Sequence, residues 1–582
     1  MNDLVFKPKT WLENAGIVGL MRILRQDQYK VVRTKTQNGA LMFELRVKSD
    51  AIDGFTSQYF NYFIETYGKY TRYQKILDGK SYLLELKDNN YQKPDLKRLV
   101  NYFDQTIKYS LLGSMKSFKQ IANYLGDDIQ IQAKGAKELE KVLTQKKTQN
   151  DPEMFKSVLK EFVKRLLSII AYFETDKARM YYQSKLLGYS IIQNAWNNKS
   201  FLDSANMKKL DPDLFGNFDK TFIKPIQDYL VEDHDADQFK CVNCGNTFKK
   251  KSDGIPITFL NGMGYDFGKK RSNGWNLLND LYICPICQLM YVSIPAGFAY
   301  NMNHQGLFIN QTHNLNVLKK LNDQVLTRLT KDLDTHNNVS VNKALMNAYK
   351  QELVLSNRSI LKNAQIISYD NEHYSFQNVS SLATTVLNKA SEYILKSGKT
   401  LVQSLMAIGI SNFNGINSFS IYDEIIKRIF NNTELSDLIY LLERLKVSNV
   451  QGVYCTAGGI MHVIELNAIM LNQLWERQGV KEMRIDDETL RKVRGYGMRI
   501  REGYATKANA KKSQALAYKM LEALRTNDLN HFMDLMLTAY LYLGQIAPSI
   551  FVNEQAKPDV FKQYGYAFIA GLIGTDQKKE NN

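Results

Sequence analysis

The sequence predicts an α+β protein that is predominantly helical, with a mixed N-terminal domain, an inserted four-cysteine module and a C-terminal helical bundle. Apolar residues recur every three or four positions across 110–230, as in FKSVLKEFVKRLLSIIAYFE, and this is the helical period. The stretch KVVRTKTQNGALMFELRVK instead alternates apolar and polar residues on both sides of Asn38-Gly39, which is typical of a β-hairpin. Four of the five cysteines form two CxxC pairs, which indicates a separate small module.

The chain of 582 residues is 44% hydrophobic, so it can bury a large core and is long enough for three or four domains at roughly 100–200 residues each. The predicted segments are an N-terminal mixed and helical region (1–235), the cysteine module (236–300), a mainly helical middle region (301–480) and a basic C-terminal helical bundle (481–582).

The first predicted helix covers Trp11 to Leu24. It is followed, after the hairpin, by GFTSQYFNYFIETYGKYTRYQKIL, where aromatic residues stand at helical spacing: Tyr59, Phe63, Tyr67 and Tyr70. Aromatic residues interleaved with cations can stack on bases. At helical spacing, however, a core position is the favoured interpretation.

Residues 401–582 are expected to be almost wholly helical. A capping signal stands at Thr433, and a helix is predicted from behind Asn527 to Gly544. Within LKSGKT, Gly398 is interpreted as a helix C-cap. The Gly-Lys-Thr ending of a phosphate-binding loop is rejected, because its first glycine position is Tyr393 and no strand precedes it.

The paired cysteines favour a structural zinc site. Two CxxC turns can complete the tetrahedral four-sulfur shell that zinc prefers, and the ligands here are Cys241, Cys244, Cys284 and Cys287. The polar N-terminus, and an apolar run broken by Arg22, give no secretory signal that would favour disulfides. Loss of the metal with retention of the turns, or a redox CxxC, are the alternatives. Residues 245–283 separate the pairs, more than the roughly 15–20 of a simple ribbon. Cys455 is interpreted as a buried apolar residue.

The net charge of +17 suggests a polyanionic partner, with a generally basic surface as the alternative. Residues 491–519 contain nine Lys or Arg and one acid, Glu502, and small residues there, such as Gly497 and Gly503, would let a phosphate chain approach. A second basic cluster lies in the glycine-containing loop between the cysteine pairs. The candidate nucleic-acid contacts are Arg491, Lys492, Arg494, Arg499, Arg501, Lys507, Lys511 and Lys512, with Lys269, Lys270 and Arg271 in that loop.

Two signals of catalysis are weaker. His234-Asp235 within VEDHDAD could belong to a metal-dependent phosphohydrolase, but the other histidines are scattered, so an exposed acidic linker is favoured. A zinc-containing nuclease would need two or three further acidic residues to hold catalytic magnesium, and the sequence offers no convincing set. We therefore expect a protein that is not an enzyme.

Several segments together resemble a known family. The second cysteine pair, the following IPAGFAY (294–300) and GLFINQTHNLNVLKKLN (306–322) are similar to the large subunit of type I-B CRISPR effector complexes, the Cascade assemblies. The N-terminal WLENAGIVGLMRIL resembles the opening of that family, and residues 484–545 resemble its end.

The resemblance implies a subunit that lies beside the crRNA 5′ end, recognises the protospacer-adjacent motif (PAM) in duplex DNA, aids unwinding and holds the displaced strand of the R-loop in antiviral defence. Its implied partners are crRNA, target double-stranded DNA, the backbone, crRNA 5′-end-binding and small subunits, and a recruited helicase-nuclease. In this family the C-terminal helical domain resembles the small subunit, which can start internally; Met483 is a possible start.

Two other classes stay open: a zinc-containing nuclease or other nucleic-acid-processing enzyme, and a helical protein-binding scaffold. A scaffold would explain the helices but not the charge of 491–519. No run approaches the roughly 18 apolar residues of a membrane helix. We therefore expect a cytoplasmic protein without a membrane partner.

Overall fold

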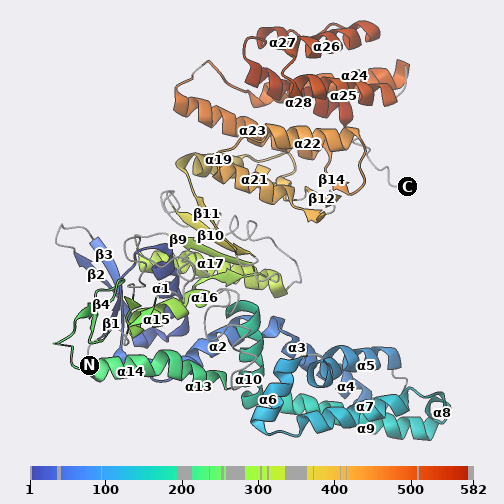
Figure 1. Ribbon diagram of the computed structural model, residues 1–582. Helices are drawn as coiled ribbons and strands as arrows, with labels where there is room; N and C mark the ends of the chain where they lie inside the picture. Colours follow the sequence, from blue (N-terminus) through green and yellow to red (C-terminus); the bar gives the residue numbers. More distant parts are fainter. Residues whose placement is uncertain are drawn as a thin grey trace. The chain divides into compact units, whose positions relative to one another are not determined.

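The computed structural model describes residues 3–35, 41–92, 95–113, 115–192, 213–234, 236–250, 254–256, 282–301, 305–310, 314–334, 364–370, 373–406, 408–413, 416–480, 482–507 and 510–574. These residues are mainly helical with several small sheets, which confirms the predicted α+β class (Figure 1). The chain divides into two compact units, residues 1–341 with 366–376, and residues 342–365 with 377–582. The four domain segments given above stay predictions.

The first unit begins with a small sheet and a long series of helices. Its elements up to residue 231 are β1 (Leu4–Phe6), α1 (Trp11–Ile23), β2 (Tyr29–Lys35), β3 (Leu41–Val47), α2 (Phe55–Tyr67), α3 (Arg72–Leu77), α4 (Lys80–Asp88), α5 (Leu96–Phe103), α6 (Lys116–Leu125), α7 (Ile129–Leu143), α8 (Lys146–Gln149), α9 (Pro152–Phe173), α10 (Asp176–Leu187), α13 (Leu214–Phe218) and α14 (Lys224–Val231).

The cysteine module and a mixed region complete this unit. Their elements are β4 (Phe239–Lys240), β5 (Thr247–Phe248), β6 (Ile255–Pro256), β7 (Tyr282–Ile283), α15 (Pro285–Val292), α16 (Ile294–Gly297), β8 (Ala299–Tyr300), β9 (Gly306–Asn310), α17 (Leu315–Asp334), β10 (Gln365–Asp370) and β11 (His373–Asn378). The strands β8 to β11 form one sheet in the order β11-β10-β9-β8.

The predicted N-terminal hairpin is present in its two strands. β2 and β3 pair antiparallel from Tyr29 opposite Val47 to Lys35 opposite Leu41, and β1 pairs with the other edge of β3. The turn at Asn38-Gly39 lies outside the described residues.

The aromatic residues of α2 are core residues. Tyr59, Phe63 and Tyr67 are at most 4% exposed, and the rings of Tyr59 and Phe63 meet edge to face with centroids 5.2 Å apart. Tyr70 is partly buried and donates to the Thr330 carbonyl at 2.9 Å. The core interpretation of this stretch is therefore confirmed.

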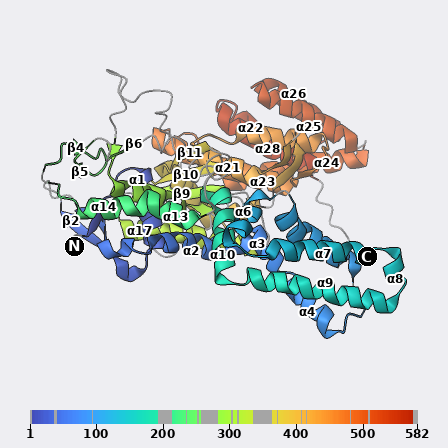
Figure 2. The same ribbon diagram turned by 60° about the horizontal axis from the view of Figure 1, so that its bottom comes forward.

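A second hydrophobic cluster in this unit is built from helices α3 to α10. Within it α7 and α9 lie side by side (Figure 2). The α9 helix begins where the Asp151 side chain accepts from the Glu153 and Met154 amides at 3.1 Å, with Pro152 in its first turn, and it buries Phe162, Leu166 and Phe173 among other residues.

The second unit contains α19 (Ser381–Glu392), α20 (Leu401–Leu405), β12 (Gly409–Phe413), β13 (Ile416–Phe419), α21 (Ile421–Phe430), α22 (Ser436–Val447), β14 (Val453–Tyr454), α23 (Ala457–Gln478), α24 (Asp487–Lys507), α25 (Ala510–Arg525), α26 (Leu529–Leu543), α27 (Ile550–Asn553) and α28 (Pro558–Ile573).

The expectation that 401–582 is almost wholly helical is wrong at one place. Three short strands pair there in the order β13-β12-β14, with Ile410 opposite both Phe419 and Val453. The third strand is distant in sequence, and each strand is too short for a two-residue period to stand out from the helical background. This pairing is therefore set by tertiary contacts.

Two predicted caps also differ from the structure. Helix α19 ends at Glu392, so Gly398 (φ 75°) lies in a tight turn inside the bridge between Ile394 and Thr400, and Thr400 caps α20. Thr433 does not cap α22, which begins three residues later. The predicted end at Gly544 is correct, with φ 68°.

Candidate functional site

The first cysteine pair lies in a turn of the hairpin formed by β4 and β5, where Phe239 pairs with Phe248. The Cys241 amide donates to the Asn246 carbonyl at 2.8 Å, and the Gly245 amide donates to the Cys241 carbonyl at 3.0 Å. Gly245 has φ 82°, a left-handed conformation that glycine adopts without steric cost. The turn therefore directs Cys241 and Cys244 toward one point.

The second pair lies at the junction of β7 and α15. Cys284 is the N-cap of α15, and Pro285 follows at the first helical position, where its missing N–H costs no hydrogen bond. Cys287 thus lies in the first helical turn, where the partial positive charge of the helix favours a thiolate. The Val242 amide donates to the Tyr282 carbonyl at 3.0 Å and joins the two turns.

The four cysteine sulfurs converge, as predicted. All four Sγ atoms lie within 4.8 Å of one another. The Cys241–Cys287 separation is 3.7 Å, and the Cys244–Cys284 separation is 3.5 Å. Four sulfurs at about 2.3 Å from one zinc ion would be about 3.8 Å apart in a regular tetrahedron. The geometry therefore fits a metal ion such as zinc.

Burial and hydrogen bonding also fit a cation at this point. Cys241, Cys284 and Cys287 are buried, and Cys244 is exposed. Hydrogen bonds from the other three thiols lower the pKa of Cys241, whereas hydrogen bonds with Cys241 and Cys244 raise the pKa of Cys284 and of Cys287. Four thiolates this close repel one another, so only a cation can hold all of them deprotonated.

Neighbouring amides orient the sulfurs. The Asn246 backbone N–H donates to Cys244 Sγ, and Asn243 Nδ2 donates to Cys287 Sγ, each at 3.4 Å. Such outer hydrogen bonds fix ligand orientation in metal sites.

The acidic stretch before the first pair is tied to the module at His234. The imidazole contacts the Tyr229 carbonyl at 2.9 Å and Asp237 Oδ2 at 2.7 Å. Burial lowers the pKa of His234, but the hydrogen bonds to Tyr229 and Asp237 outweigh it and raise that pKa. The Tyr229 hydroxyl in turn donates to the Thr247 carbonyl of β5 at 2.8 Å. Asp235 lies outside the described residues.

Helix α1 supports the second cysteine turn from behind. A Cβ atom at Gly16, Gly19 or Gly297 would overlap a backbone carbonyl oxygen of the opposing segment, so glycine permits α1 to pack closely on α15 and α16. The Tyr291 hydroxyl donates to Glu13 at 2.6 Å, and the same carboxylate accepts from the Thr10 amide at 2.9 Å in a capping box.

The buried side chain of Arg22 connects α1 to α16 and α17. Arg22 Nη1 donates to the Ala296 and Gly297 carbonyls at 2.8 Å and to the Phe298 carbonyl at 3.1 Å, which satisfies the C-terminal end of α16. Its Nε bonds to Asp323 of α17 at 2.8 Å. Of the segments that resemble one family in sequence, 11–24 forms α1, and the described parts of 294–300 and 306–322 pack against it through α16, β9 and α17.

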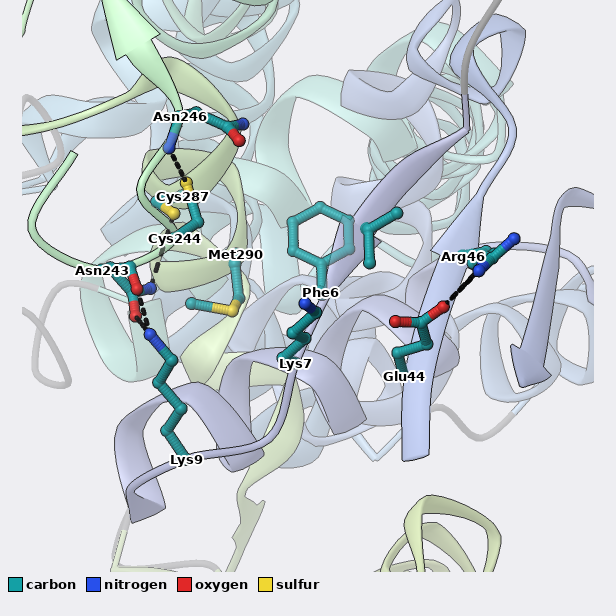
Figure 3. A pocket seen from close by; sticks show the side chains of 11 residues that line it. Phe6, Lys7, Lys9, Glu44, Arg46, Asn243, Cys244, Asn246, Cys287 and Met290 are labelled. Carbon is teal, nitrogen blue, oxygen red and sulfur yellow. Dashed lines mark hydrogen bonds and ion pairs between the residues drawn. The ribbon is translucent and has the colours of Figure 1, made fainter. Parts of the chain in front are cut away.

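A cavity of about 290 Å³ adjoins the cysteine cluster (Figure 3). Its lining combines the first unit's small sheet with both cysteine turns: Val5, Phe6, Lys7, Lys9, Glu44, Arg46, Asn243, Cys244, Asn246, Cys287 and Met290. Sequence reasoning missed it, because Lys9 and Asn243 are 234 positions apart and no motif joins them.

The predicted basic cluster of 491–519 lies on α24 and α25 of the second unit (Figure 1). Several of its cations already have intramolecular partners. Arg491 bonds to Glu465 at 3.3 Å, Lys492 bonds to Glu488 at 2.8 Å, and Lys507 donates to the Leu543 carbonyl at the end of α26 at 2.8 Å.

Other members of this cluster lie on aromatic rings. Arg499 lies 5.4 Å from the centroid of Tyr496, and Lys512 lies 5.9 Å from that of Tyr542. Arg499 and Lys512 are exposed, whereas Arg494 and Arg501 are half-buried. The Lys511 side chain and the whole of Lys269, Lys270 and Arg271 lie outside the described residues.

The glycines of α24 have a different role from the one expected. A Cβ at Gly497 would overlap the Phe568 carbonyl of α28, and one at Gly503 would overlap the Leu543 side chain. Gly495 alone among these three has open space around it. Close helix packing, rather than approach by a phosphate chain, therefore explains Gly497 and Gly503.

A comparison with protein families gives a match over the cysteine module. Residues 234–299 match a family model described as CRISPR-associated protein (Cas_CXXC_CXXC), and this segment contains all four converging cysteines. No curated protein and no solved structure matches the chain. The match indicates a CRISPR-associated protein and supports a role in CRISPR defence. Among the described residues, no helix is long and apolar enough to cross a membrane.

Proposed function

We propose that this protein is the non-catalytic large subunit of a type I-B CRISPR RNA-guided complex, which recognises a short protospacer-adjacent motif in duplex DNA, aids unwinding and holds the displaced strand. The observation that carries the proposal is the family match over the two cysteine pairs, together with the packing of the other family-like segments around α1. Guide pairing would supply sequence specificity, and the protein would read a short motif and the backbone.

The metal in this proposal is a structural zinc ion held by Cys241, Cys244, Cys284 and Cys287. A four-sulfur site leaves no open position for a substrate or water, so zinc would add folding stability rather than chemistry. The cation would hold β4–β5 against the start of α15, because each pair of ligands comes from one of these elements.

The basic helices α24 and α25 are the proposed backbone contact for nucleic acid. Lys and Arg that contact phosphates contribute affinity and salt dependence, with no sequence information of their own. In this role we assign the strongest contribution to Arg499, Arg501 and Lys512, because Arg491, Lys492 and Lys507 are engaged within the chain.

Co-purification tests the complex directly. The tagged chain, expressed with the neighbouring genes of its own locus and a repeat array, should purify with a crRNA and a repeated backbone subunit. Purification of the chain alone under these conditions, with no bound RNA, contradicts the proposal.

A nuclease assay separates the main alternative. We expect the purified chain with Mg²⁺ or Mn²⁺ to bind single- and double-stranded DNA and to leave both intact. Cleavage that co-elutes with the protein, and that survives stringent purification, would instead favour the zinc-containing nuclease.

A further inference from the structure

The cavity beside the cysteine cluster is close in size to a small-molecule site. Its volume, about 290 Å³, is at the lower end of the roughly 300–1,000 Å³ that small-molecule sites occupy. Figure 3 shows its two walls, with Lys9, Asn243 and Asn246 on the side of the cysteine turns and Glu44 and Arg46 on the side of β3. Phe6 and Lys7 lie between them.

The charges of the lining favour an anion. Three cations, Lys7, Lys9 and Arg46, face one carboxylate, Glu44. Arg46 Nε is bonded to Glu44 at 2.7 Å, so these two largely neutralise each other. Lys9 donates to the Asn243 carbonyl and, at 3.2 Å, to its side-chain oxygen. Among the described residues, Lys7 has neither an acidic nor a hydrogen-bonding partner, so its ammonium is free for a ligand.

The rest of the lining suits a flat, partly apolar group with a polar edge. Val5, which is 39% exposed, contributes apolar surface, whereas Met290 is 2% exposed and contributes little. The side-chain amide of Asn246 has no hydrogen-bond partner within the described part of the chain. An amide offers both a donor and an acceptor, which is what the edge of a nucleobase requires.

We propose that this cavity binds one unpaired nucleotide of a nucleic-acid strand, with its phosphate at Lys7 and its base edge at Asn246. This inference rests on the proposed function, because it supplies that nucleic-acid partner with a specific contact in the first unit. Single-strand sites combine cations along the backbone with surfaces that take a base; here Lys7 supplies the cation and Val5 an apolar surface, without an exposed aromatic ring among the lining residues.

The same geometry couples the nucleotide to the metal centre. The Asn246 backbone N–H donates to Cys244 Sγ at 3.4 Å, so the residue at the proposed base edge also contacts the cysteine cluster. In the same wall Lys9 donates to Asn243, whose Nδ2 donates to Cys287 Sγ. Any change that the ligand makes in metal affinity must be matched by an equal effect of the metal on ligand affinity.

A charge-reversal pair tests the binding. Purified full-length chain is titrated against fluorescein-labelled single-stranded DNA and RNA of about 12 nucleotides, with affinity read by anisotropy. Lys7→Glu should weaken binding of the preferred strand about tenfold or more. Lys30→Glu is the matched control, because Lys30 is exposed on β2, pairs with Asp3 at 3.2 Å and lies outside the cavity lining. It should change affinity by less than about twofold.

Zinc content and unfolding temperature are measured on both variants, so that a folding defect is recognised. Equal affinities of the two well-folded variants would overturn the inference. If the wild-type chain binds neither strand, the proposed function itself fails, and this outcome is distinct from the first. Lys7→Ala serves as the second variant, and it should flatten the log–log salt dependence by about 0.7.

Metal release tests the coupling independently of affinity. With an excess of chelator, bound oligonucleotide should slow zinc loss from the wild-type chain about fivefold, and this protection should disappear in Lys7→Glu. AMP, added alone at millimolar concentration, should protect weakly, because it lacks the adjoining backbone. Identical release with and without oligonucleotide would contradict the coupling.

Discussion

The cysteine centre of the first unit and the basic helix α24 of the second both stand out in the sequence. They differ in how many of their side chains are available to bind a ligand in the structure. The four cysteines are paired in sequence and converge in space, at distances that could hold a metal ion. The nine cations of 491–519 are dense in sequence, yet part of their charge is used inside the protein. Ligand motifs fix geometry locally, whereas charge density leaves open where each side chain points.

The contacts of Arg491 and Lys507 on α24 show how positive charge is used inside the protein. Glu465 is buried, which raises its pKa, and the guanidinium of Arg491 opposes that shift. Arg491 and the Tyr393 hydroxyl, which donates to Glu465 at 3.4 Å, therefore offset part of the cost of burying this carboxylate. Lys507 similarly satisfies a C-terminal carbonyl of α26. Counting cations in the sequence therefore overestimates the surface that is free for nucleic acid.

The largest expected effect concerns the metal centre. Cys284→Ser should lower bound zinc from about one equivalent per chain to well below half, and should unfold the module around it, because a structural zinc site contributes its binding energy to folding. Elemental analysis and limited proteolysis between 234 and 299 measure both. Cys455→Ser is the control, since Cys455 is buried in the second unit and outside the cluster. Unchanged zinc content in Cys284→Ser contradicts the structural-metal assignment.

Two glycines of α24 sharpen the comparison within one helix. Gly497→Ala should destabilise the second unit by about 1–3 kcal/mol or more, because its Cβ overlaps the Phe568 carbonyl of α28. A Cβ at Gly495 would meet no described atom within 4 Å apart from the backbone of its own helix, so Gly495→Ala should be neutral or stabilising by up to about 1 kcal/mol, through helix propensity. Urea denaturation measures both. Similar values for the two variants would refute the assignment of Gly497 to helix packing.

A buried acid of α22 predicts a pH dependence in the same unit. Glu443 is fully buried, and within the described part of the chain neither of its carboxylate oxygens has a hydrogen-bond partner; burial raises its pKa well above the ordinary 4.5. A raised folded-state pKa gives stability that is fully present below about pH 4.5 and is lost as pH rises through the folded value. The pKa of the Tyr566 phenol on α28 is also raised, first by burial and second by the charge of Glu443.

Glu443→Leu should therefore raise stability at pH 7 by about 1–3 kcal/mol, the cost of an unsatisfied buried polar group. It should also flatten the dependence of stability on pH above about 4.5. Thermal unfolding from pH 5 to pH 8 is the measurement. If the wild-type chain instead became more stable from pH 5 to pH 8, and Glu443→Leu removed that gain, Glu443 would be charged and paired.

The smallest effect concerns the salt dependence of DNA binding by the basic cluster. Replacing Arg499, Arg501 and Lys507 with Ala should reduce the log–log salt slope for single-stranded DNA by about two units if all three contact phosphates, and leave motif preference unchanged. Because Lys507 caps α26, Arg499→Ala with Arg501→Ala should account for most of the change, about 1.4 units. Arg491→Ala is the control. It should lower the free energy of unfolding of the second unit and change the salt slope of DNA binding little. An unaltered slope in the folded triple variant assigns the charge to a solvated face or to a protein interface.

The sequence by itself determined the helix-rich α+β class, the first helix, the hairpin strands, the buried aromatic stripe of α2 and the set of four cysteines that converge. These features follow from local periodicity or from ligand spacing, which need few long-range contacts. Tertiary structure decided the sheet of β12, β13 and β14, the turn at Gly398, and the packing of Gly497.

Only the tertiary structure, likewise, joined Lys9 to Asn243 and placed Lys7, Arg46 and Asn246 around one cavity. The contacts across this cavity join the sheet of β1 and β3 to turns more than two hundred residues later in the chain, and side-chain partners at such separation leave no periodic trace in sequence. The exposure of cations in the basic cluster likewise depends on contacts that are distant in sequence. Its residue types were visible in the sequence, but packing of α24 against α23, α26 and α28 selected which cations remain exposed.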